Sequence, residues 1–133
     1  MKKYLLLVLS IILLSSCLKN TEPLQELKLL PIDEVSVPAF FTFNQVDTIK
    51  VKYTLPNSCH YFHSLYYQYQ DTTRIIAIRA VKISDRSCAE VIQQKELKIP
   101  ILVSQREDYL LKFWKGKDNN QEDIFEEIII SVK

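Results

Sequence analysis

Apolar side chains recur at every second position over much of the chain, which is the period of a β-strand with one buried face. The clearest example is Thr48 to Leu55, where one side of the strand is apolar and the other is polar. The apolar side consists of Ile49, Val51, Tyr53 and Leu55. This alternation predicts a half-buried antiparallel strand.

The same period predicts further strands, and turn-forming residues separate several of them. The predicted strands are 27–37 (broken at Pro31), 60–68, 74–83, 97–103, 109–114 and 128–132, with turns at 56–58, 70–71 and 117–120. Pro100 predicts that segment 97–103 is an edge strand or carries a bulge. Segment 89–97 has some helical character and is predicted to be a short helix or a loop that crosses between sheets.

About seven short strands without long helical periodicity predict an all-β fold, an antiparallel two-sheet sandwich of immunoglobulin-like kind. A small barrel is the alternative. The segment Glu107 to Phe113 resembles the start of the sixth strand of such sandwiches, in which a tyrosine, here Tyr109, hydrogen-bonds to upstream backbone. The predicted domain spans residues 26–133, which is one domain of ordinary size.

Three aromatic residues are the candidates for a binding surface: Trp114, Tyr66 and Tyr67. The alternation places Trp114 on the face opposite Tyr109 and Phe113, and an outward tryptophan beside Ile129 or Leu110 would form an apolar contact patch. Burial of Trp114 under a loop or the tether is the alternative. Tyrosines also form strands well, so Tyr66 and Tyr67 could instead fill the core and shield the sheet.

The first residues have the layout of a signal peptide. Lys2 and Lys3 precede an apolar run from Tyr4 to Leu14, which is too short to cross a bilayer core because a spanning helix needs about 20 residues. The run ends in Leu14-Ser15-Ser16-Cys17, which resembles the lipobox of bacterial lipoproteins. An ordinary secretory leader with an incidental cysteine is the alternative.

The lipobox resemblance implies that residues 1–16 are removed and that Cys17 carries a diacylglycerol and an acylated amino group. Residues 17–25 then form a lipidated tether that attaches the domain to a membrane. The chain also resembles small lipoproteins of Bacteroidetes-like bacteria with an immunoglobulin-like domain. In those bacteria an acidic run after the cysteine marks export to the cell surface. Segment 18–22 has only one acid, so we expect the outer membrane, facing the periplasm, with the surface as the alternative.

Cys59 and Cys88 remain as an even pair once Cys17 is assigned to lipid. In an oxidising compartment such a pair predicts a disulfide, here one that joins loops at one end of the domain. Two free or metal-binding thiols are the alternative. His60 and His63 lie three apart on a predicted strand and point to opposite faces, so no metal site is expected.

Composition and charge argue against several functions. The chain has 17 basic and 16 acidic residues, and loss of Lys2 and Lys3 leaves 15 against 16, so no nucleic-acid partner is expected. Gly116 is the single glycine, which excludes glycine-rich phosphate loops, and no cofactor is expected.

The acidic pairs are sequence neighbours that face opposite ways on a strand, so no catalytic residues are expected. These observations favour a non-catalytic envelope binding module with a protein or glycan partner. The alternatives are a structural or assembly subunit of an envelope complex, and an enzyme or inhibitor.

Overall fold

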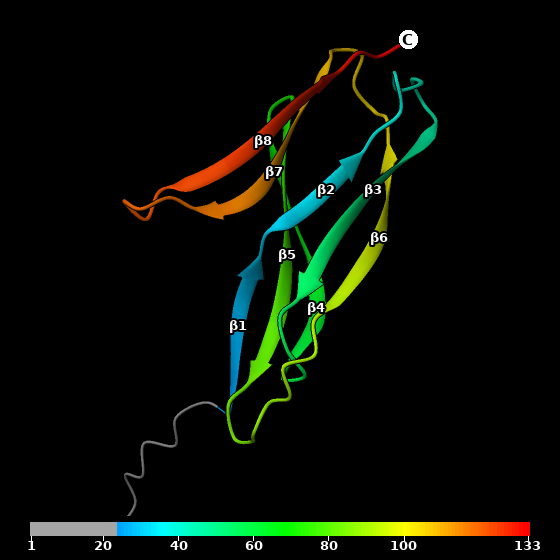
Figure 1. Cartoon of the computed structure of the whole chain (residues 1–133). Helices are drawn as coiled ribbons and strands as arrows, with labels where there is room; N and C mark the ends of the chain where they lie inside the picture. Colours follow the sequence, from blue (N-terminus) through cyan, green and yellow to red (C-terminus); the bar gives the residue numbers. More distant parts are fainter. Residues whose placement is uncertain (1–23) are drawn as a thin grey trace, which may run out of the picture.

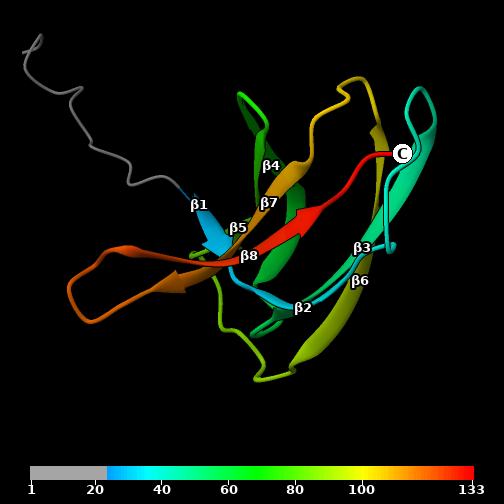
Figure 2. The same ribbon diagram turned by 90° about the horizontal axis from the view of Figure 1, so that it is seen from above.

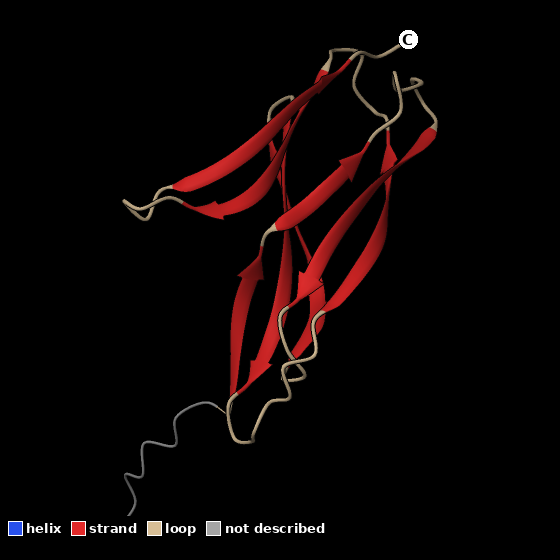
Figure 3. Cartoon of the chain, viewed as in Figure 1, coloured by secondary structure: helices blue, strands red, loops and turns tan. Residues whose placement is uncertain are grey.

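The computed structural model describes residues 24–133, which form eight strands in two facing sheets (Figure 1). Strand ribbons and loops account for this whole part of the chain (Figure 3). The strands are β1 (Gln25–Leu30), β2 (Ile32–Ser36), β3 (Val46–Leu55), β4 (His60–Gln70), β5 (Thr73–Ile83), β6 (Gln93–Leu102), β7 (Tyr109–Lys117) and β8 (Asp123–Ile130). The predicted sandwich is therefore confirmed, and residues 24–133 contain no helix that could cross a membrane.

β5 is the centre of the five-stranded sheet. One edge of β5 pairs with β4, while the other edge is shared by β1, which pairs near its end, and β7, which pairs near its start. β8 then pairs with β7. The β5–β7 pair is parallel, because the chain crosses to the other sheet and back between these two strands.

β2, β3 and β6 form the second sheet, in that order. The chain passes from the first sheet to the second at Pro31, between β1 and β2, which is where the alternation of the sequence was broken. Pro100 of β6 lies opposite Thr48 of β3, and β6 is an edge strand, as the proline predicts. Seen from above, the two sheets form two layers with the core between them (Figure 2).

The core consists of the inward-facing side chains of both layers. Ile49 and Val51 of β3 face Ile76 and Ile78 of β5, and all four are fully buried. A buried side chain of this size stabilises the fold by about 1.5–3 kcal/mol relative to exposure. The alternation read from the sequence therefore corresponds to the division between core and surface.

Segment 89–97 was predicted to be a short helix or a loop that crosses between the sheets; the crossing loop is correct for residues 89–92, and the helix is wrong. Residues 84–92 form the loop that crosses between the sheets, and β6 begins at Gln93, which pairs with Leu55 of β3. Pairing along the whole of β3 supplies a backbone partner for Gln93 to Leu97 and outweighs a weak helical preference of a glutamine-rich segment.

Two predicted contacts are present. The Ser104 N–H donates to the Tyr109 hydroxyl at 3.2 Å, which is the expected tyrosine corner at the start of β7. Cys59 and Cys88 form a disulfide with a Cα–Cα distance of 5.4 Å. The bond joins the turn before β4 to the loop after β5, at the end of the domain where Leu24 accepts a hydrogen bond from Ser84.

Candidate functional site: a cleft between β4 and β6

The two sheets are open along the side formed by β4 and β6. Each of these strands pairs on one edge only, β4 with β5 and β6 with β3. A cleft of about 450 Å³ lies between them, within the range of about 300–1,000 Å³ typical of small-molecule sites. Its lining comprises Phe62, Leu65, Tyr67 and Tyr69 of β4, residues 97–102 of β6, Arg74 and Ser104.

Irregular positions on both strands keep these edges from pairing with another strand. β4 has a bulge between Phe62 and Ser64, which leaves His63 without a partner on β5. β6 carries Pro100, which has no N–H to donate. Bulges and prolines are the features by which exposed sheet edges avoid edge-to-edge association.

Arg74 lies at one end of the cleft, on the inner face of β5, and is only 5% exposed. Its Nη1 donates to the carbonyl oxygens of Asp71 at 2.7 Å and Thr73 at 3.0 Å. Its Nη2 donates to Gln105 Oε1 at 2.7 Å. The guanidinium is thus held rigidly by the β4–β5 turn and by the loop before β7.

The side chains that surround the Arg74 guanidinium are aromatic and neutral. The guanidinium lies 4.6 Å from the ring centroid of Tyr69 and 4.9 Å from that of Tyr109. Among residues 24–133 no acidic side chain forms an ion pair with it, and its Nε has no hydrogen-bond acceptor. A buried cation without a carboxylate partner is rare in proteins, and it makes this end of the cleft electropositive.

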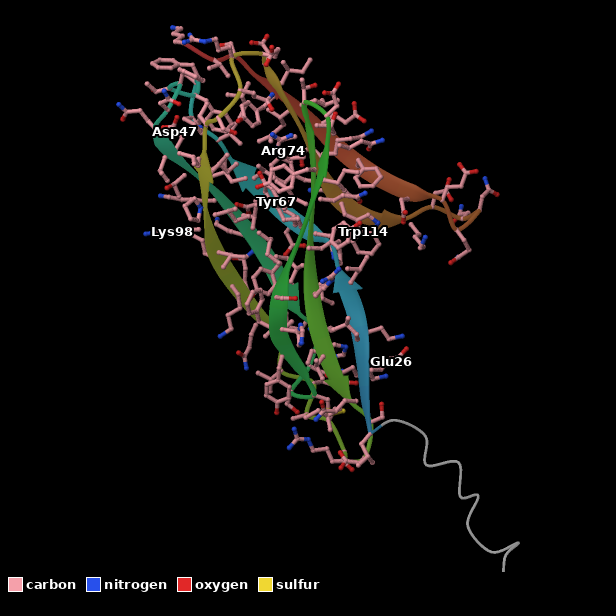
Figure 4. The ribbon with its side chains drawn as sticks, turned by 180° about the vertical axis from the view of Figure 1, so that it is seen from behind. Glu26, Asp47, Tyr67, Arg74, Lys98 and Trp114 are labelled. Atoms are coloured by element: carbon pink, nitrogen blue, oxygen red, sulfur yellow. A yellow bond between two sulfur atoms is a disulfide. The ribbon has the colours of Figure 1, made fainter. Side chains whose placement is uncertain are left out.

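Tyr67 is the second polar group of this end of the cleft, close to Arg74 between β4 and β6 (Figure 4). Burial raises the pKa of its phenol to about 12, although the positive charge of Arg74 acts in the opposite direction. Tyr67 is therefore neutral at physiological pH and keeps its O–H as a donor. Its ring packs edge-on against Tyr69 at 5.1 Å.

Tyr66 and Trp114 lie on the opposite, outer face of the five-stranded sheet, where both line a small hollow of about 190 Å³. The predicted register of Trp114 is correct, but the prediction that it is exposed is wrong, since it is only 9% exposed. Its Nε1 donates to Asp123 at 2.9 Å, and its partner on β8 is Phe125. Within residues 24–133, side chains of the neighbouring strand β8 therefore cover Trp114.

The remaining predicted positions lie elsewhere. Cys17 is outside the described residues. His60 and His63 have separate partners, since the Nδ1 of His60 lies 2.7 Å from Asn57 Oδ1 and the Nδ1 of His63 lies 2.9 Å from Ser64 Oγ. Of the three aromatic candidates, only Tyr67 lines the cleft.

Arg74, the most unusual residue of the cleft, was not among the predicted site residues. The sequence pattern does indicate its unusual position: in the alternation of this strand, Arg74 falls on the same face as the apolar Ile76 and Ile78. A charged residue at a position that should face the core indicates either a strand end or a functional group.

A family model matches residues 49–126, which run from β3 into β8 and include every cleft residue. Its description is the ORF11 beta-sandwich domain. The chain belongs to this family. No curated protein and no solved structure matches the chain. Membership of the ORF11 beta-sandwich family agrees with the two-sheet architecture, and the family description names a fold rather than an activity.

Proposed function

We propose that this protein is a lipid-anchored, non-catalytic binding module of the bacterial cell envelope, and that its ligand site is the cleft between β4 and β6. The observation that carries the proposal is Arg74, a buried cation without an acidic partner among residues 24–133, at the end of an apolar cleft. Convergent polar groups at an apolar pocket are typical of binding sites.

The polar groups of the cleft favour binding over catalysis. The guanidinium of Arg74 offers only N–H donors, and Tyr67 stays neutral because burial raises its pKa to about 12. A phenol with this pKa holds a ligand without exchanging protons with it, whereas general acid–base catalysis needs a pKa near the working pH.

The lipobox-like segment supports the envelope location. Several acyl chains on Cys17 would hold the domain on a bilayer far more firmly than a single chain. The seven residue-to-residue steps from Cys17 to Leu24 reach at most about 25 Å, so the end of the domain with the disulfide would face the membrane. We place the protein in the outer membrane, facing the periplasm, with the cell surface as the alternative.

Replacement of Cys17 tests the anchor. The variant Cys17→Ser should lose incorporation of labelled palmitate and move from the membrane fraction to the soluble fraction, since lipid transfer needs the thiol. Membrane association and labelling equal to those of the wild type would contradict the lipoprotein assignment.

Native mass spectrometry of the full chain extracted from its membrane tests the cleft. We expect a bound small molecule that is retained by the wild type and lost from Phe62→Ser/Leu102→Ser, which changes two exposed cleft residues. The matched control is Leu27→Ser/Ile129→Ser, which changes two exposed residues outside the cleft. Absence of an adduct, or an adduct that survives the cleft substitutions, would refute the cleft as the ligand site.

A further inference from the structure

We infer that the cleft binds an elongated apolar molecule with a single carboxylate, which lies on Arg74 while the apolar chain runs along β4 and β6 toward Phe62. This inference rests on the proposed function and names its ligand class. The juxtaposition that carries it is one uncompensated, buried guanidinium at one end of a cleft whose lining is otherwise mostly apolar.

The charges of the cleft select an anion. Arg74 and Lys98 line it, and none of its lining residues is acidic. The Nε of Arg74 is buried and has no acceptor among residues 24–133, so the guanidinium keeps one unsatisfied donor at this end of the cleft. An ionised carboxylate only accepts hydrogen bonds, and its bonds to guanidinium are about twice as strong as those between neutral groups.

The shape of the cleft selects a long ligand. Its lining on β4 extends from Phe62 to Tyr69, and a strand rises about 3.3 Å per residue, so the cleft extends over about 20 Å. Arg74 and Tyr69 lie near the β4–β5 turn, whereas Phe62 and Leu97 lie toward the other end. One buried cation at one end fits a molecule with one charged end and an apolar body.

The strand edges disfavour an added peptide strand as the occupant. Strand addition uses a regular row of N–H and C=O groups along an exposed edge. The bulge at His63 interrupts that row on β4, and Pro100 removes a donor from β6. Side-chain contacts in the cleft, rather than backbone pairing, are therefore the interactions that this site offers.

Photo-crosslinking of the full chain in its own membrane tests the inference. The probes are a long-chain monocarboxylic acid with a diazirine in the chain and the primary alcohol of the same chain. We expect saturable labelling by the acid within residues 60–70 and 93–102, the two cleft strands. Half-maximal labelling by the alcohol should need at least roughly tenfold more probe, because the charged hydrogen bonds are lost.

Two variants locate the carboxylate. Arg74→Gln should remove the preference for the acid while leaving labelling by the alcohol unchanged. Because Arg74 is buried and this variant could fail to fold, the exposed Tyr69→Glu serves as the second variant. Tyr69 lies beside the Arg74 guanidinium, so a carboxylate there should repel the acid more than the alcohol. Ile129→Glu, equally exposed but outside the cleft, is its matched control and should behave as the wild type.

The outcomes separate this inference from the proposed function. Equal labelling of the cleft strands by acid and alcohol would overturn the carboxylate and leave a cleft-binding module. Labelling that is unsaturable or spread over the surface would overturn the inference. If the native mass spectra also lacked a cleft-dependent adduct, the proposed function would fail with it.

Discussion

On the side where β2 approaches β7, hydrogen bonds join the two sheets, whereas on the side of β4 and β6 the sheets are separated by the cleft. Lys115 Nζ of β7 donates to the Asp33 carbonyl of β2 at 2.9 Å. The segment after β2 pairs with the C-terminus, since Phe41 N donates to Ser131 O at 2.8 Å and Lys133 N donates to Phe41 O at 2.9 Å. One side is thus closed by backbone, and the other is lined by side chains.

Each side of the sandwich contains a β-bulge, in β7 on the closed side and in β4 on the open side. In β7 the register with β8 shifts between Trp114 and Gly116, so Lys115 has no residue opposite it on β8, and its Nζ reaches the Asp33 carbonyl of β2 as well as Glu126. Gly116 has φ of +114°, a conformation that favours glycine. In β4 the bulge at His63 instead interrupts a free edge. The same backbone irregularity therefore joins the sheets on one side and keeps them open on the other.

The largest expected difference between the two sides is in the free energy of unfolding that is lost when a phenylalanine is truncated to alanine. Phe41 on the closed side is fully buried, with its ring 5.2 Å from that of Tyr109, whereas Phe62 on the open side is 42% exposed. Phe41→Ala should lower the free energy of unfolding by about 3–5 kcal/mol. Phe62→Ala should lower it by much less, and denaturant unfolding of both variants measures the difference. Equal losses would mean that the cleft is as tightly packed as the closed side.

The disulfide should matter most for the open side, because β4 has only β5 as a strand partner. Removing it with Cys59→Ala/Cys88→Ala should destabilise the domain by about 3–4 kcal/mol, since the bond closes a loop of sequence separation 29. Hydrogen exchange should then rise more in β4 than in β8. Thiol counting on the unfolded, unreduced wild type is the control and should find no free Cys59 or Cys88. A uniform rise of exchange across both strands would show that the bond supports the whole domain equally.

A smaller effect is expected at the bond that joins the sheets. Lys115→Met removes the donor to Asp33 and to Glu126, whose Oε2 lies 3.1 Å from Lys115 Nζ. Because the side chain is partly exposed, the free energy of unfolding should fall by about 1 kcal/mol. Lys98→Met on the open side has no such bond to lose and is the matched control. An unchanged stability of Lys115→Met would show that backbone pairing at Phe41 closes this side alone.

The sequence predicted the sandwich, nearly all of its strands, the tyrosine corner and the disulfide because these depend on local alternation and on residue type. It could not predict the cleft, which depends on which strands become unpaired edges and on how far apart the sheets lie. Trp114 illustrates the limit. The alternation along the strand predicted which face of the sheet Trp114 occupies, but the burial of Trp114 depends on Phe125 and Asp123 of another strand. The alternation along β5 could have predicted that Arg74 faces inward, whereas only the structure shows that it has no acidic partner among residues 24–133.

The last effect concerns Tyr67 and is confined to alkaline pH, and it measures how far water is excluded from the open side. Burial raises the pKa of Tyr67 to about 12, so between the ordinary tyrosine value of about 10 and 12 the unfolded chain ionises at this position while the folded chain does not. This residue's contribution to stability is therefore fully present below pH about 10 and is lost as the pH rises toward about 12. Burial also raises the pKa of Tyr53, so absorbance titration of tyrosinate should find a group that ionises near pH 12 in the folded protein and is absent from Tyr67→Phe and from the wild type in denaturant. If Tyr67→Phe titrated like the folded wild type, the phenol would be hydrated and the cleft would be open to water down to Arg74.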